Sequence, residues 1–123
     1  MNVKWNDSTI IDLQNIINIS RGNPDHILKY LKQFMELIPE RLKDLKISLE
    51  NGDRMMIRQI LHKMSPQLQF FGVKNVTTPI QRMEFEYQSM PIKELEHLVN
   101  DIIAKLEEAV AEVSKIIESN FEY

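Results

Sequence analysis

The sequence predicts an all-α protein, an antiparallel up-down four-helix bundle with a short additional helix near its N-terminus. Apolar residues recur every three or four positions along four long segments, the spacing that places them on one face of a helix. No stretch alternates as a half-buried strand would, and 3 glycines and 5 prolines leave few breaks between helices. Four amphipathic helices joined by short turns can bury their apolar faces together as such a bundle.

The short helix is expected to begin after Asp7 and Ser8, because either side chain can accept hydrogen bonds from the free N–H groups of a first turn. A second helix is expected to begin at Asn23, a capping residue, followed by Pro24, whose fixed φ suits the first helical position. Asp25 favours the same end of the helix dipole. The inward residues expected of the short helix are Ile10, Leu13, Ile16 and Ile17.

The second helix is expected to be long. Pro39 lies inside its pattern, but the apolar stripe continues in phase beyond it, so we expect a kink and not a stop. Gly52 is expected to end the helix in a left-handed conformation, and Asp53 to cap the next helix. The stripe consists of Ile27, Leu31, Phe34, Ile38, Leu42, Leu45 and Leu49.

The third helix is expected to close at Gly72 and to bury Ile57, Ile60, Leu61, Met64 and Leu68. Two further helices complete the bundle. Thr78 before Pro79 repeats the cap-then-proline signal and predicts a fourth helix. Its expected inward residues are Ile80, Met83 and Tyr87. The last helix is expected to span the whole bundle and to bury Ile92, Leu95, Val99, Ile102, Leu106, Val110, Val113 and Ile117.

The composition favours one soluble, cytoplasmic domain covering residues 1–123. A chain of 123 residues with 43% hydrophobic content can form one core, and no cysteine is present for disulfides or thiolate metal sites. The sequence has neither the apolar run of a signal peptide nor one long enough to span a membrane. A formal net charge of −3 disfavours nucleic-acid binding. With no spare apolar stripe, we expect a monomer.

The third predicted helix presents a histidine to solvent. His62 projects away from the apolar face of that helix, and helical spacing places Arg58, Ser65 and Gln69 along the same side of the surface. We interpret this as a cationic patch rich in hydrogen-bond donors, in which an arginine favours the neutral, nucleophilic imidazole and can bind phosphoryl oxygens. Geometry alone also allows a plain surface histidine.

The other two histidines have simpler interpretations. His97 follows Glu94 by three residues, as in di-iron bundles, but it falls outside the apolar stripe and no second such pair exists. His26 lies in the first turn of its helix. We interpret both as surface residues, and we expect no metal site in this chain.

The segment "LHKMSPQLQFFG" resembles the phosphoacceptor helix of histidine-phosphotransfer (HPt) domains. His62, Met64 and Gly72 fall in register with that pattern, which continues to an acidic residue matched by Glu84. The upstream segment "RGNPDHILKYLKQFMELIPERLKDLKISLENGD" is similar to the preceding helix of the family. The resemblance covers a core of about residues 8–118 and implies the same order of helices.

Two positions depart from the family pattern beside the histidine. The lysine three residues after the acceptor is Ser65 here, and the glycine that follows it is Pro66. Serine brings no charge, so we expect Arg58 to supply the compensating cation, because Lys63 points away from the acceptor. Pro66 leaves the carbonyl of His62 without its helical donor and is expected to kink the helix.

The resemblance implies a phosphorelay intermediate. His62 would accept a phosphoryl group from an aspartate of a receiver domain and pass it to another receiver, with response regulators and hybrid histidine kinases as partners. The chain would need no cofactor, because Mg²⁺ is expected on the partner receiver, and it would have no autokinase activity, since the sequence has no glycine-rich phosphate loop. Met55, Pro66 and Gly72 are the expected docking surface.

Two alternatives remain at this point. One is an adaptor with the same fold that binds receivers or kinases without carrying phosphate, favoured by the substitutions at Ser65 and Pro66. The other is a helical oligomer or metal carrier, which would require polar ligands facing inward, where the stripes show almost none.

Overall fold

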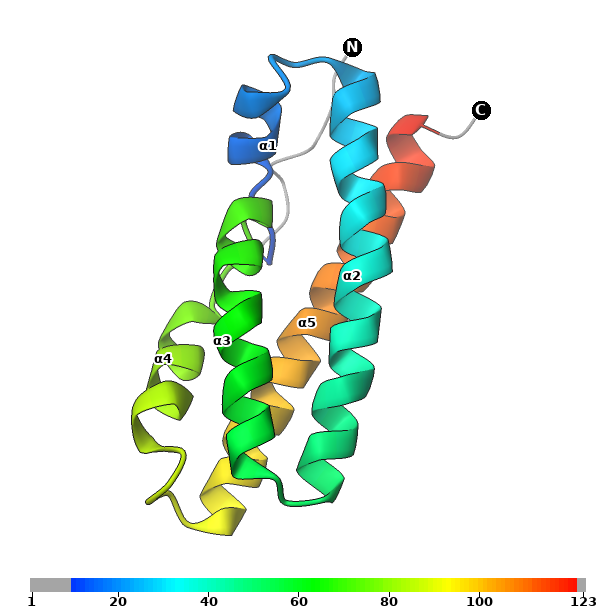
Figure 1. Cartoon of the computed structure of the whole chain (residues 1–123). Helices are drawn as coiled ribbons and strands as arrows, with labels where there is room; N and C mark the ends of the chain where they lie inside the picture. The colour runs from blue at the N-terminus through cyan, green and yellow to red at the C-terminus, as the bar shows by residue number, and fades with distance from the viewer. Residues whose placement is uncertain (1–9, 122–123) are drawn as a thin grey trace.

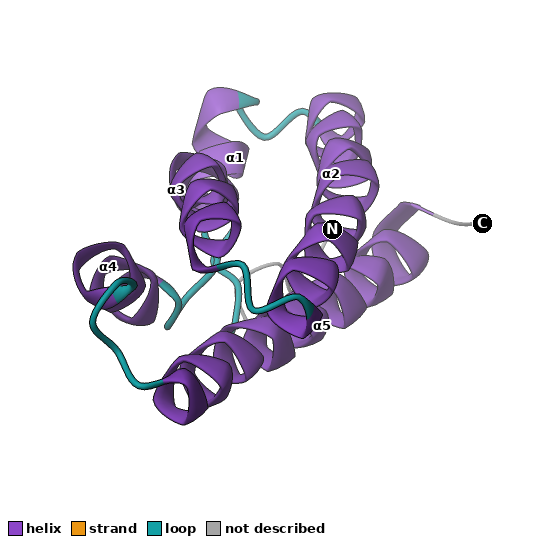
Figure 2. Cartoon of the chain, turned by 60° about the horizontal axis from the view of Figure 1, so that its bottom comes forward, coloured by secondary structure: helices purple, strands orange, loops and turns teal. Residues whose placement is uncertain are grey.

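The computed structural model describes residues 10–121, and within them the chain forms five helices. α2 packs against α3 and α5, and α4 packs against α3 and α5 in turn, so these four close into a ring (Figures 1 and 2). α1 packs on α2 and α3 at one end. The predicted all-α bundle with a short N-terminal helix is confirmed. The helices are α1 (Gln14–Ile19), α2 (Pro24–Glu50), α3 (Arg54–Phe71), α4 (Thr77–Glu86) and α5 (Ile92–Phe121).

α2 begins and ends where its capping residues predict. The side chain of Asn23 accepts a hydrogen bond from the backbone N–H of Asp25 at 2.9 Å, and Pro24 is the first helical residue. The helix continues through Pro39. It ends before Gly52, whose φ of 62° lies in the left-handed region and whose N–H donates to the carbonyl of Leu49 at 3.1 Å.

α3 is likewise bounded by its predicted residues. The side chain of Asp53 accepts from the N–H of Met56 at 3.0 Å, and Gly72 ends the helix at a φ of 77°. α3 continues through Pro66, one turn after His62. The apolar residues predicted to face inward are all buried: Ile57, Ile60, Leu61, Met64 and Leu68.

α1 begins later than the sequence predicts. The expected caps Asp7 and Ser8 lie outside the described residues, and the first helical residue is Gln14, whose N–H donates to the Asp12 carboxylate at 2.9 Å. The segment before it pairs its backbone with the α3–α4 connection: Lys74 N–H donates to the Ile10 carbonyl at 2.7 Å. This long-range pairing includes an isolated β-bridge between Ile11 and Val73, and it explains why the segment is not part of the helix. The burial of Ile10, Leu13 and Ile16 was predicted correctly, and Ile17 packs half-buried against the core.

α4 begins at Thr77, so the prediction that Thr78 caps it is wrong. Val76 stands at the cap and contributes no side-chain hydrogen bond. Pro79 lies in the first turn, where its missing N–H would have no helical partner. Ile80 and Met83 are buried as predicted, and Tyr87, just beyond the helix end, is half-buried.

α5 spans the bundle, but its inward face drifts from the predicted one. Ile92, in the first turn, is 43% exposed, and Val110 and Ile117 are only half-buried. Ala109 and Ile116 take the inward positions instead, because the buried residues of α5 keep a seven-residue repeat, and this repeat drifts around a helix of 3.6 residues per turn. Leu49, near the end of α2, is also half-buried. None of the described helices is both long enough and apolar enough to cross a membrane.

Candidate functional site

Three residues of α3, spaced by four, form a row that faces α4: Arg54, Arg58 and His62. Arg54 Nη1 donates to the carbonyl oxygen of Tyr87 at 2.9 Å, and the guanidinium carbon of Arg58 lies 5.8 Å from the centre of the Tyr87 ring. The third member, His62, brings its Nδ1 to 2.9 Å from Oε1 of Glu84. A four-residue spacing places side chains one above another on a helix, so this row contacts α4 and its C-terminal end.

The pairing of His62 with Glu84 follows from the connection between the two helices. α3 and α4 run antiparallel and are joined at Gly72–Val76, and His62 and Glu84 stand equally far from Val73 in the sequence. Residues at equal distances from the turn of an antiparallel helix pair lie at the same height. His62 and Glu84 lie close to a common height, and their side chains meet there.

The imidazole of His62 is open to solvent on its other side. Its side chain is 63% exposed, while that of Glu84 is 24% exposed, which confirms the prediction of an outward histidine. A carboxylate can only accept a hydrogen bond, so Nδ1 must carry the proton when the two are bonded. The neutral ring then has its lone pair on Nε2, for which no residue in the described range 10–121 is a partner.

The predicted cationic patch is corrected by this contact, because Glu84 places a negative charge directly against the imidazole. Arg58 is half-buried, and its guanidinium lies beside the Tyr87 ring. Ser65 is half-buried and Gln69 is exposed. The roles of Arg58, Ser65 and Gln69 in binding a phosphoryl group stay predictions.

The predicted docking residues differ in their surroundings. Met55 is 57% exposed, and Pro66 lines an open groove between α2 and α3 with Leu37 and Phe70. Gly72 has an internal packing role that the sequence analysis did not include, because a Cβ there would lie 1.7 Å from the carbonyl oxygen of Asp12. Participation of these three residues in docking stays a prediction.

The remaining histidines are on the surface, as predicted. His26 and His97 are both exposed, and Glu94, which precedes His97 by three residues, pairs with Arg82. Within residues 10–121, no three His, Cys, Asp or Glu side chains gather as metal ligands would.

Sequence reasoning missed two features of this surface. Glu84 was matched to a family pattern, but its contact with His62 was not inferred, although their equal spacing from Val73 is the signal that could have predicted it. Phe85, the next residue of α4, is 87% exposed. A single apolar residue on the outer face of a helix carries no periodic signal by which it could have been found.

No protein-family model matches this chain, and no curated protein does. Among solved structures, the chain is similar to the crystal structure of the HPt domain from a sensor hybrid histidine kinase of Shewanella, with a TM-score of 0.74 at 16% sequence identity. The similarity covers 90% of this chain and 96% of that domain. The chain therefore has the fold of a histidine-phosphotransfer domain.

Proposed function

We propose that this protein is a phosphorelay carrier that accepts a phosphoryl group on Nε2 of His62. The single observation that carries the proposal is an exposed imidazole whose Nδ1 is held by Glu84, on a bundle with the HPt fold. This arrangement leaves the second ring nitrogen as the accessible nucleophile. The fold contributes a rigid helix on which that nitrogen is presented.

In the proposed reaction, the Nε2 lone pair attacks the phosphorus of a phosphoaspartate in line and forms an N–P bond. The P–O bond to the aspartate breaks, and its electron pair leaves with the carboxylate. The ring keeps its Nδ1 proton and becomes positively charged, and the Glu84 carboxylate at 2.9 Å stabilises that charge. Transfer to a second receiver reverses these bond changes with a new aspartate oxygen as the nucleophile.

The partners proposed for this chain are receiver domains of response regulators and hybrid histidine kinases. The HPt domain with the similar structure is itself part of a sensor hybrid histidine kinase, which supports that choice. We place the Mg²⁺ ion on the receiver, because the Glu84 carboxylate beside His62 is already hydrogen-bonded to the imidazole. We also propose that the chain carries phosphate without autokinase activity.

The transfer proposal is tested with receiver domains phosphorylated by acetyl [³²P]phosphate and then mixed with the purified chain. We expect an acid-labile label on the wild-type protein and none on His62→Gln. His97→Gln is the matched control, because it removes another exposed α-helical histidine, and it should be labelled like the wild type. Failure of the wild type to acquire label from any receiver of the same genome, or labelling of His62→Gln, would refute the proposal.

One observation favours an adaptor that binds receivers without carrying phosphate. The guanidinium of Arg58 lies against Tyr87, and Ser65 brings no charge, so no cation of residues 10–121 contacts the imidazole itself. Binding separates the two functions: an adaptor and its His62→Gln variant would bind a receiver equally well, and neither would acquire label.

A further inference from the structure

α4 carries the carboxylate that holds His62, yet it is a short helix with few anchors. It has 10 residues, no side-chain hydrogen bond at its N-terminal cap, and two buried side chains, Ile80 and Met83. Short helices depend on tertiary contacts for their position, because their own hydrogen bonds barely offset the cost of nucleation. The position of Glu84 relative to His62 therefore depends on what fixes α4 against α3.

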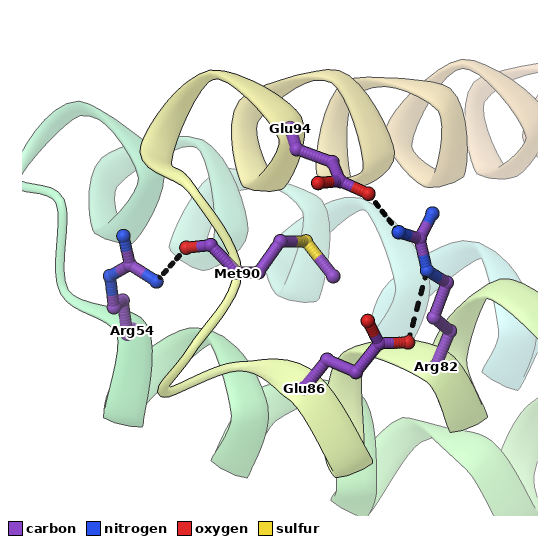
Figure 3. Close-up of polar contacts among 5 residues, drawn as sticks. All are labelled: Arg54, Arg82, Glu86, Met90 and Glu94. Carbon is purple, nitrogen blue, oxygen red and sulfur yellow. Dashed lines mark hydrogen bonds and ion pairs between the residues drawn. The ribbon is translucent and has the colours of Figure 1, made fainter.

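Arg54 makes the hydrogen bonds that tie the C-terminal end of α4 to α3, beside the contact of Arg58 with the Tyr87 ring. Its Nη1 donates to the carbonyl oxygens of Tyr87 and Met90, and the bond to Met90 is drawn in Figure 3. The last carbonyls of a helix have no partner within it, and a cation there also complements the negative end of the helix dipole. The Arg54 side chain is partly buried in this position, so these bonds are shielded from water.

A second arginine holds the other side of the same helix. Arg82 bonds to Glu86 at 3.1 Å and also to Glu94, which joins α4 to α5 (Figure 3). The hydrogen bonds that Arg82 donates to Glu94 and to Glu86 stabilise its charged form and raise the pKa of Arg82 above its ordinary value. Arg82 thus fixes α4 to α5, whereas Arg54 fixes it to the helix that bears His62.

We propose that Arg54 is a positioning residue that keeps Glu84 within hydrogen-bond reach of His62 Nδ1. Arg54 and His62 stand on α3, two turns apart, and on α4 Glu84 lies one turn before Tyr87. Sliding α4 by one residue moves Glu84 by about 1.5 Å, enough to break a 2.9 Å hydrogen bond. By holding the end of α4, Arg54 sets which ring nitrogen of His62 carries the proton.

The consequence for phosphoryl transfer rests on the proposed function, but the tautomer of His62 can be measured without it. Long-range ¹H–¹⁵N NMR of the histidine ring distinguishes Nδ1–H from Nε2–H in the neutral form. We expect Nδ1–H to predominate in the wild type. Glu84→Ala removes the acceptor. Its tautomer ratio is the reference for a His62 without the hydrogen bond to Glu84.

Arg54→Met removes the donors while keeping an unbranched apolar stem. We expect its His62 to shift from the wild-type tautomer ratio toward that of Glu84→Ala. The matched control is Lys46→Met, which removes a cross-helix bond to Glu107 at 3.1 Å between α2 and α5, away from α4. It should keep the wild-type ratio, because a general loss of stability does not move the tautomer of the folded state.

A folded Arg54→Met protein with the wild-type tautomer ratio overturns the positioning role. Should that variant not fold, Arg54→Gln is read in the same way, because its shorter side chain cannot serve both carbonyls. The proposed function fails separately: a His62 that shows the predicted tautomer changes but never acquires phosphate contradicts phosphoryl transfer and leaves the role of Arg54 standing.

Discussion

At the scale of single residues, the two ring nitrogens of His62 have different roles. Nδ1 is held by Glu84 at 2.9 Å, and Nε2 is left to react on a side chain that is 63% exposed. An unrestrained surface histidine would sample many orientations and both tautomers. Glu84 therefore orients the acceptor, fixes its proton and compensates the charge that develops on phosphorylation.

Removing that carboxylate should slow transfer. A hydrogen bond to a charged group contributes about 1.5–3 kcal/mol, so we expect Glu84→Ala to reduce the rate of phosphoryl transfer to His62 by about ten- to a hundredfold. Glu84→Gln keeps a neutral acceptor for Nδ1, so its transfer rate should fall between those of the wild type and Glu84→Ala. Single-turnover transfer from a phosphorylated receiver measures all three rates. A wild-type rate in Glu84→Ala would show that the contact has no part in the reaction.

Arg58 is expected to contribute a cation to the transferring phosphoryl group. Arg58→Ala should slow transfer, while its loss of the contact with Tyr87 costs about 0.5–1 kcal/mol of unfolding free energy. Tyr87→Leu is the matched control, because it removes the same contact and keeps the guanidinium. Urea unfolding and transfer rates are measured on both. If the two variants transfer equally fast, Arg58 does not act on the phosphoryl group.

At the scale of helices, the sequence predicted those boundaries that local chemistry determines. Asn23, Asp53 and Gly72 bound α2 and α3 as expected, because a cap or a left-handed glycine acts within a few residues. The start of α1 was not predictable in this way. It depends on pairing of Ile10 with Lys74 and of Asp12 with Gly72, far apart in the sequence, which no local pattern encodes.

The same distinction applies to the candidate site. The outward direction of His62 was predictable from the helical period, because it depends on one helix alone. Its contact with Glu84 and that of Arg58 with Tyr87 depend on how α4 packs on α3. That packing involves residues of two helices and the turn between them, so the period of one helix could not reveal it, and only the equal spacing of His62 and Glu84 from Val73 indicates it.

Gly72 offers a test of the packing at that turn. Its φ of 77° disfavours any side chain, and an added Cβ would meet the backbone of Asp12. We expect Gly72→Ala to lower the free energy of unfolding by roughly 2–4 kcal/mol. Gly52→Ala is the control: its φ of 62° is similar, but nothing lies within 4 Å, so its cost should be about 1 kcal/mol. Equal losses in urea unfolding would contradict the close approach.

At the scale of the whole molecule, the ring of helices gives the bundle distinct faces. The α3–α4 side carries His62, Glu84 and Arg58, and the α2–α5 groove, lined by Met35, Leu42 and others, lies across the ring from it (Figure 2). A receiver must approach His62 to exchange phosphate, so its footprint should centre on α3. The opposite groove should stay free.

That footprint is tested by placing a charge on one face at a time. Met55→Glu should weaken receiver binding by about 1 kcal/mol or more, because Met55 is exposed two turns before His62 on the same side of α3. Ala111→Glu introduces the same charge at an exposed residue of α5 that lines the opposite α2–α5 groove, and it should leave binding unchanged. Calorimetric titration with a receiver measures both. Equal weakening would contradict a footprint centred on His62.

The most direct test of the central claim is to locate the phosphoryl group itself. The chain, labelled with ¹⁵N in its histidines, is phosphorylated by a phosphorylated receiver, and coupling between ³¹P and ¹⁵N identifies the bonded nitrogen. We expect a single phosphorus–nitrogen bond at Nε2 of His62, with Nδ1 still protonated beside Glu84. A phosphoryl group on Nδ1, on His26 or His97, or on no histidine would contradict it.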